Sequence, residues 1–179
     1  NYGKAERVMR VLGLDPGLRA TGWGVIDVTS HRLGFVDAGT VKTPTTAPMA
    51  HRLADMHRAL VDIAADFAPD EAAVEETFVN RNPASALKLG QARGAVLLVP
   101  GLLGIPVAEY SANHVKKSVC GSGHAPKEQI SAMVAMLLPG FSSDSFDAAD
   151  ALAVAICHTH HSQSEARIEA AELAMSEGR

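Results

Sequence analysis

The sequence predicts an α/β domain built on one mixed five-stranded sheet, with three antiparallel strands, then two parallel ones, and helices on its faces. Three observations predict this fold. Short apolar runs that suit strands alternate with longer segments of helical periodicity. The first three runs are joined by turns too short for a crossover, which indicates antiparallel pairing. The last two runs are separated by a helix-length segment, which permits parallel pairing.

The elements follow from local patterns along the chain. Short apolar runs bounded by turn residues predict strands at residues 7–15, 21–28, 32–41, 71–75 and 105–110. Apolar residues at steps of three and four, Asn82-Pro83 as a helix start and Ser142 to Ser145 as a cap predict helices at 48–67, 83–98, 112–118, 127–138 and around 148–156. We therefore expect one domain over residues 1–161, of which 1–6 form an extension, and a frayed or partly helical polar tail over 162–179.

Length and composition indicate the number of domains and the cellular location. At 179 residues the chain suits one domain with a full core. The most apolar stretch, residues 95–107, is interrupted by prolines and glycines, so no membrane span is expected. No signal peptide is visible, and Cys120 and Cys157 are expected to be free thiols, which favours a cytoplasmic location.

The charge of the chain is unevenly distributed. The formal net charge is −4, yet residues 77–127 carry six cations against the single anion Glu109. A local basic field suits a nucleic-acid substrate, although an ordinary solvated surface explains the charge equally well. The candidate nucleic-acid-binding cations are Arg81, Lys88, Arg93, Lys116, Lys117 and Lys127.

Four carboxylates lie where such a sheet would bring them together. Asp15 ends the first strand, Glu75 ends the fourth, and Asp147 and Asp150 lie on one face at the start of an apolar helix. In open α/β sheets the functional crevice lies beyond the carboxyl ends of the strands. Glu76 should point away from it, because neighbouring side chains on a strand alternate between faces. A turn aspartate and helix-start acids are the alternative explanation.

Acids gathered in one crevice repel one another unless a cation shares the site. Oxygen ligands in this number suit Mg²⁺, with Mn²⁺ as a substitute. Two ions about 3.5–4 Å apart would support phosphoryl transfer, with Asp15 as the bridging ligand and Lys116 or Lys127 steadying the phosphate charge.

Three further features have both a structural and a functional explanation. Phe78 follows Glu75 closely and is either a core residue or an aromatic wedge that stacks on an unpaired base. Gly90 and Gly94 lie one turn apart on a small-residue helix and favour close approach of another helix, from a second copy or from the same chain. The cluster of His158, His160 and His161 is expected to be exposed at a helix end.

Four stretches together resemble the RuvC type of bacterial Holliday-junction resolvase, in the ribonuclease-H/integrase-like superfamily. These are Leu12–Gly17, Val74–Phe78, Ser85–Gly94 and Asp147–Ala153. The resemblance implies a ribonuclease-H-like fold and a metal-dependent endonuclease that binds four-way DNA junctions as a homodimer and makes paired nicks. It also implies a branch-migration motor as a partner.

The resemblance carries over to single residues. It implies that Asp15, Glu75, Asp147 and Asp150 are the catalytic metal ligands. Phe78 matches the aromatic that stacks at the junction, and Lys116 and Lys127 match basic positions near the scissile phosphate. The alternatives are another ribonuclease-H-like nuclease acting on hybrids or flaps, and a junction-binding scaffold without catalysis. An actin-like kinase would need a much longer chain.

Overall fold

The computed structural model describes residues 8–30, 32–76, 82–142 and 145–177. Its elements are β1 (Met9–Asp15), β2 (Ala20–Val28), β3 (Leu33–Lys42), α1 (Met49–Phe67), β4 (Glu71–Glu76), α2 (Pro83–Leu103), β5 (Val107–Ser111), α3 (Ala112–Cys120), α4 (Lys127–Leu137) and α5 (Phe146–Glu177). The predicted strands and helices are all present, with boundaries shifted by a few residues.

The five strands form one sheet in the order β3-β2-β1-β4-β5. β1 pairs with β2, and β2 with β3, in antiparallel register, whereas β4 runs parallel to β1 and β5 runs parallel to β4. The predicted fold class is confirmed. Because β1, β4 and β5 are parallel, their carboxyl ends meet at one edge of the sheet.

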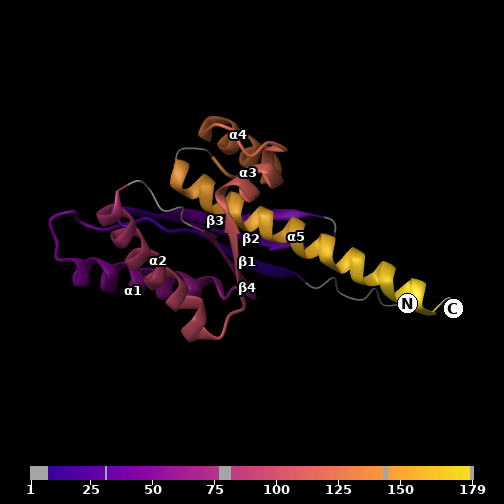
Figure 1. Cartoon of the computed structure of the whole chain (residues 1–179), viewed down its shortest axis with the longest axis horizontal. Coiled ribbons are helices and arrows are strands. Elements are labelled where there is room, and N and C mark those ends of the chain that lie inside the picture. Colours follow the sequence, from indigo (N-terminus) through magenta and orange to yellow (C-terminus); the bar gives the residue numbers. More distant parts are fainter. Residues whose placement is uncertain (1–7, 31, 77–81, 143–144, 178–179) are drawn as a thin grey trace.

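Helices cover both faces of the sheet (Figure 1). Alternate residues of β1 point to opposite faces, so Leu12 and Leu14 pack with Met56 of α1 and Val96 of α2, while Val11 packs toward α5. α5 crosses the sheet on the second face, where α3 and α4 lie against it. The two apolar cores hold the three layers together.

Glycines on the sheet let α5 approach closely. A β-carbon at Gly13 would overlap the backbone carbonyl of Ala151, and one at Gly22 would overlap the carbonyl of Asp147. Only glycine therefore lets the backbone of α5 rest on β1 and β2 at these points. This contact places the first turns of α5 beside the carboxyl end of β1.

α5 is longer than the sequence predicted. The segment after His161, expected to be a frayed or partly helical tail, is helical as far as Glu177. Residues 162–177 contain neither glycine nor proline, and alanine, glutamate, leucine and methionine favour helix there. Likewise, α2 continues through Pro100 to Leu103 and ends at the left-handed Gly104. Pro100 lies in the last turns, where the loss of one backbone donor is tolerated.

Candidate active site

Three of the predicted acids line one cavity. Asp15 ends β1 and Glu75 lies at the end of β4, and the pairing of Leu14 with Val74 sets the two acids side by side. Asp150 joins them from the second turn of α5. The cavity has a volume of about 240 Å³, and its lining consists of Asp15, Glu75, Ala112, Val115, Lys116, Lys127, Ile130, Asp150 and Ala153. The prediction that these acids converge holds for Asp15, Glu75 and Asp150.

The carboxylates have strongly raised pKa values. Burial, followed by the charges of Glu75 and Asp150, raises the pKa of Asp15 to about 8. Burial and the charge of Asp150 raise the pKa of Glu75 to about 7. Burial also raises the pKa of Asp150, although Lys127 opposes that change. The site therefore concentrates negative charge that the protein alone does not fully compensate.

Two lysines supply the cationic side of the cavity, as the sequence predicted. The Lys127 ammonium donates a hydrogen bond to Asp150 Oδ2 at 3.2 Å, and the neighbouring carboxylate raises the pKa of Lys127. The charge of Lys116 lowers the pKa of Glu75, partly offsetting the effect of burial. Both lysines lie within the cavity lining, so they are placed to meet a bound phosphate.

Asp147 occupies a different place from the other three acids. It lies in the first turn of α5 and is absent from the cavity lining. Its charge nevertheless raises the pKa of Asp15 and of Asp150, which shows that it is close to both. Glu76, by contrast, is exposed, as strand alternation predicted.

The donor chemistry of the site fits a hard divalent cation. Asp15, Glu75 and Asp150 present only carboxylate oxygens, the ligands that Mg²⁺ and Mn²⁺ prefer. Among the described residues, however, no three His, Cys, Asp or Glu side chains already form a metal-binding group. The Lys127 ammonium instead provides a countercharge to Asp150. An ion would be held by these three acids once their side chains turned toward it.

The other predicted site residues have varied surroundings. Phe78 and Arg81 lie outside the described residues. Lys88 is exposed on α2, while the Arg93 guanidinium pairs with Glu109. Lys117 is exposed on α3 and lines a separate cavity that also contains His114 and His160. Lys88, Arg93 and Lys117 therefore do not line the cavity that contains Asp15, Glu75 and Asp150.

A buried hydrogen-bonded chain was missed in the sequence. His158 bonds through Nδ1 to the hydroxyl of Tyr110 at 2.8 Å and through Nε2 to Glu71 Oε2 at 2.6 Å. The expectation of an exposed His158 was wrong, because α5 continues beyond it and packs on the sheet. Burial raises the pKa of Tyr110 to about 12. Since Tyr110 pairs with Glu75 across β4 and β5, these hydrogen bonds brace the neighbour of the strand that carries Glu75.

This mixed sheet, with partly buried acids at the ends of β1 and β4 beside α5, has the ribonuclease-H-like fold, and its acid site is of the kind that nucleases of this fold use. The chain belongs to the RuvC family. The family model described as "Crossover junction endodeoxyribonuclease RuvC" matches residues 11–158. The family suggested by the sequence motifs is thereby confirmed.

Individual relatives agree with this assignment. The crossover junction endodeoxyribonuclease RuvC of Xanthobacter autotrophicus is 60% identical over 163 residues, which cover 91% of this chain and 96% of the relative. The protein of the same name from Paramagnetospirillum magneticum is 61% identical over 153 residues, covering 86% and 92%. Among solved structures, T. thermophilus RuvC in complex with a Holliday junction substrate has a TM-score of 0.81 at 34% identity, covering 88% and 96%.

Proposed function

We propose that this protein resolves four-way DNA junctions by hydrolysing phosphodiester bonds at the cavity between β1, β4 and α5. One observation carries the proposal: a RuvC-family chain places three partly buried acids and two lysines in a single cavity. The carboxylates suit a cation, and the lysines suit the phosphate that the cation must approach. The solved relative from T. thermophilus is bound to a Holliday junction, which supports the same class of substrate.

We further infer dependence on Mg²⁺, with Mn²⁺ as a substitute and two ions in each site. The metal, when bound, would supply positive charge and Lewis acidity for phosphodiester hydrolysis. Asp15, Glu75 and Asp150 would hold it, and Asp147 would add negative charge from the rim. Lys116 and Lys127 would donate hydrogen bonds to phosphate oxygens as negative charge develops there.

A homodimer formed through α2 would supply the second nick. The outer face of α2 is apolar yet uncovered: Leu87 is 67% exposed, Leu98 49% and Leu102 69%. Apart from the backbone of α2 itself, no described atom lies within 4 Å of a β-carbon built on Gly90 or Gly94, so none of the other described helices packs on these glycines. A second copy of α2 is the partner that this face fits. The two-fold axis of such a dimer would present two equivalent active sites to a symmetric junction.

The apolar character of α2 has one other explanation. By length and composition alone α2 could cross a membrane, and only 22% of its most apolar window is buried in the chain. Yet Val96 and Val99 pack into the core beneath it, and Arg93 pairs with Glu109. A dimer interface accounts for both the buried inner face and the apolar outer face.

We also propose that the protein is cytoplasmic and that a branch-migration motor delivers junctions to it. The family resemblance implies the motor.

Cleavage assays on the acid variants test the catalytic proposal. We expect Asp15→Asn and Glu75→Gln to abolish nicking of a synthetic four-way junction in Mg²⁺ while retaining junction binding, because other phosphate contacts provide the affinity. Glu76→Gln is the matched control, since Glu76 is the exposed neighbour of Glu75. Wild-type cleavage rates in Asp15→Asn or Glu75→Gln would refute the assignment. Faster cleavage of flap or hybrid substrates than of junctions would favour another ribonuclease-H-like activity.

Sedimentation tests the dimer. Gly94→Leu places a large side chain on the outer face of α2 and should yield monomers that bind junctions weakly and lose paired nicking. Ala54→Leu adds the same side chain at an exposed position of α1 and should remain dimeric. A wild-type chain that is monomeric at micromolar concentration with junction bound would contradict the interface, as would a fully active dimeric Gly94→Leu variant.

A further inference from the structure

A second polar cavity lies between α3 and α5, separate from the catalytic acids. Its volume is about 320 Å³. The lining combines one lysine, three histidines, two serine hydroxyls and a buried thiol: Lys117, His114, His160, His161, Ser118, Ser164 and Cys157. The described lining contains no carboxylate. The Ser164 hydroxyl already donates to the backbone carbonyl of His160, so the lysine and histidine nitrogens are the donors that suit an anion accepting several hydrogen bonds.

The donors of this cavity are held in place by packing. His160 bonds through Nδ1 to the Ser118 hydroxyl at 3.1 Å, which leaves Nε2 as the ring nitrogen that can meet a ligand. The rings of His114 and His161 meet edge to face at 5.9 Å, and both contact the ring of Tyr110 edge-on, at 5.5 and 5.7 Å. The cavity wall is therefore preorganised rather than formed by unrestrained surface side chains.

The surrounding charges favour an anion over a metal ion. Among the described residues, the His and Cys side chains of this cavity do not form a metal-binding group. One carboxylate approaches the rim: Glu165 lies 3.2 Å from His161 Nε2 and is 68% exposed, so water screens its charge. Behind the wall, Glu71 is already bonded to His158. The Lys117 side chain lines the cavity and is exposed, so its charge is accessible to an anion from solvent.

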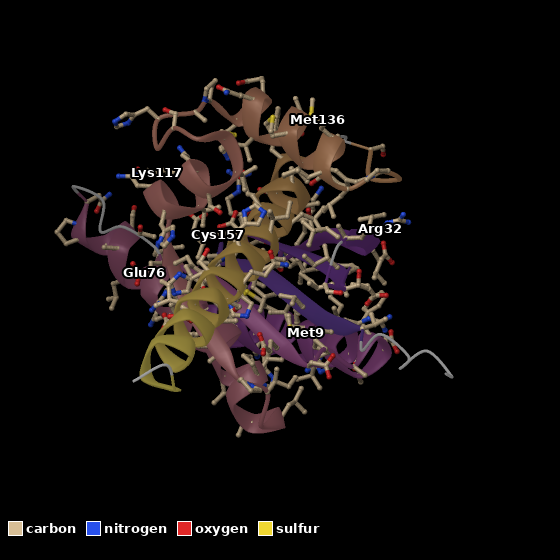
Figure 2. The ribbon with its side chains drawn as sticks, turned by 90° about the vertical axis from the view of Figure 1, so that its right-hand side faces the viewer. Met9, Arg32, Glu76, Lys117, Met136 and Cys157 are labelled. Carbon is tan, nitrogen blue, oxygen red and sulfur yellow. The ribbon has the colours of Figure 1, made fainter. Side chains whose placement is uncertain are left out.

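The position of the cavity relates it to the catalytic site. Consecutive residues of α3 serve the two cavities, because Lys116 lines the catalytic one and Lys117 lines the second. Along α5, Cys157 and His161 lie about 10 and 16 Å beyond Asp150 at the helical rise of about 1.5 Å per residue. Lys117 and Glu76, which ends the strand of a catalytic acid, lie toward the same side of the molecule (Figure 2).

We propose that the cavity between α3 and α5 holds a backbone phosphate of a junction arm, outside the active site. A DNA strand advances about 3.4 Å per nucleotide along its axis. The offset along α5 therefore places this phosphate about three to five nucleotides from the scissile one. Lys117 and His160 bind it, and Glu165 weakens that binding by competing for His161. The inference rests on the proposed junction-cutting function and adds a second anchor for the arm.

Junction binding without cleavage, measured in EDTA across a range of salt, tests the inference. Lys117→Gln should lower the slope of log affinity against log salt by about 1, the effect of one lost phosphate contact. Arg58→Gln removes an exposed cation from α1, on the opposite face of the sheet, and should leave the slope unchanged. Glu165→Gln should tighten binding, a gain that the loss of a structural contact would not produce.

Phosphate replacement then locates the contact. A neutral methylphosphonate at one position about three to five nucleotides from the cut should weaken binding by the wild type and have no further effect on Lys117→Gln. Two results would overturn this inference: an unchanged salt slope in Lys117→Gln, or an equal loss of binding to the methylphosphonate junction in both proteins. If the wild type still nicks junctions in Mg²⁺, the proposed function would stand. A wild type that fails to nick them would overturn the proposed function together with this inference.

Discussion

Replacing Asp15 by asparagine should stabilise the protein in the absence of metal. The folded state holds the Asp15 proton up to a pKa of about 8, whereas the unfolded chain loses it near the ordinary value of 3.8. Folded protein therefore binds more protons than unfolded protein between these values. Since stability falls with pH wherever the folded state binds more protons, the free energy of unfolding should decrease as pH rises from about 4 to 8. Asparagine does not ionise and removes this dependence.

The size of the effect follows from the same two pKa values. The raised pKa of Asp15 lowers the free energy of unfolding by about 2 kcal/mol at pH 5 and by about 5 kcal/mol at pH 8. The stability difference between Asp15→Asn and the wild type should therefore widen by about 3–4 kcal/mol over this range. For a chain of this length, 1 kcal/mol corresponds to about 2–4 °C in Tm. The difference in Tm should widen by roughly 10 °C.

Thermal unfolding at pH 5 to 8 in EDTA measures this difference. Glu76→Gln provides the control, because it removes an exposed carboxylate next to Glu75 and should show the pH profile of the wild type. Adding Mg²⁺ at pH 8 should raise the Tm of the wild type more than that of Asp15→Asn, since the cation neutralises the same charges. A constant difference in Tm between pH 5 and 8, or a less stable Asp15→Asn variant at pH 8, would refute the reasoning.

Two further predictions concern residues around the site. Phe78→Ala should keep the Tm of the wild type but cleave junctions poorly, because we expect Phe78 to stack on DNA; a stability loss of about 3–5 kcal/mol with normal activity would instead mark a core residue. His158→Phe should lower the free energy of unfolding in urea by about 1–3 kcal/mol, because it leaves the buried Tyr110 hydroxyl and the partly buried Glu71 carboxylate without their hydrogen-bond partner. An unchanged midpoint in urea would show that this buried chain contributes no stability.

The sheet could be predicted because its signals are local. Apolar runs, turn residues and the lengths of the connections together determine which strands pair and in which direction. The end of α5 was harder to place, because the polar residues after His161 resemble a tail, and the burial of His158 depends on how the helix lies across the sheet. Similarly, Pro100 looks like a helix end in the sequence but is accommodated inside α2.

The candidate site was predictable where strand geometry determines it. Asp15 and Glu75 end neighbouring parallel strands, so their proximity follows from the register of β1 and β4. Asp147 and Asp150 share a helical face, yet only Asp150 enters the cavity. Which of the two enters the cavity depends on how α5 rests on the sheet, where the Asp147 backbone comes close to Gly22, and no pattern in the sequence reveals this packing.

The energetics of the cavity connect its stability to its chemistry. Burying Asp15, Glu75 and Asp150 together raises the pKa of each, which means that the folded protein is stabilised by protons or by any cation that replaces them. Lys127 is one such cation, but it is tethered to the chain and hydrogen-bonded only to Asp150 among the described acids. A divalent ion would neutralise more of this charge and free the Lys127 ammonium to meet the substrate phosphate. The burial and mutual repulsion that raise these pKa values are therefore the physical reason for our proposal that a divalent cation binds here.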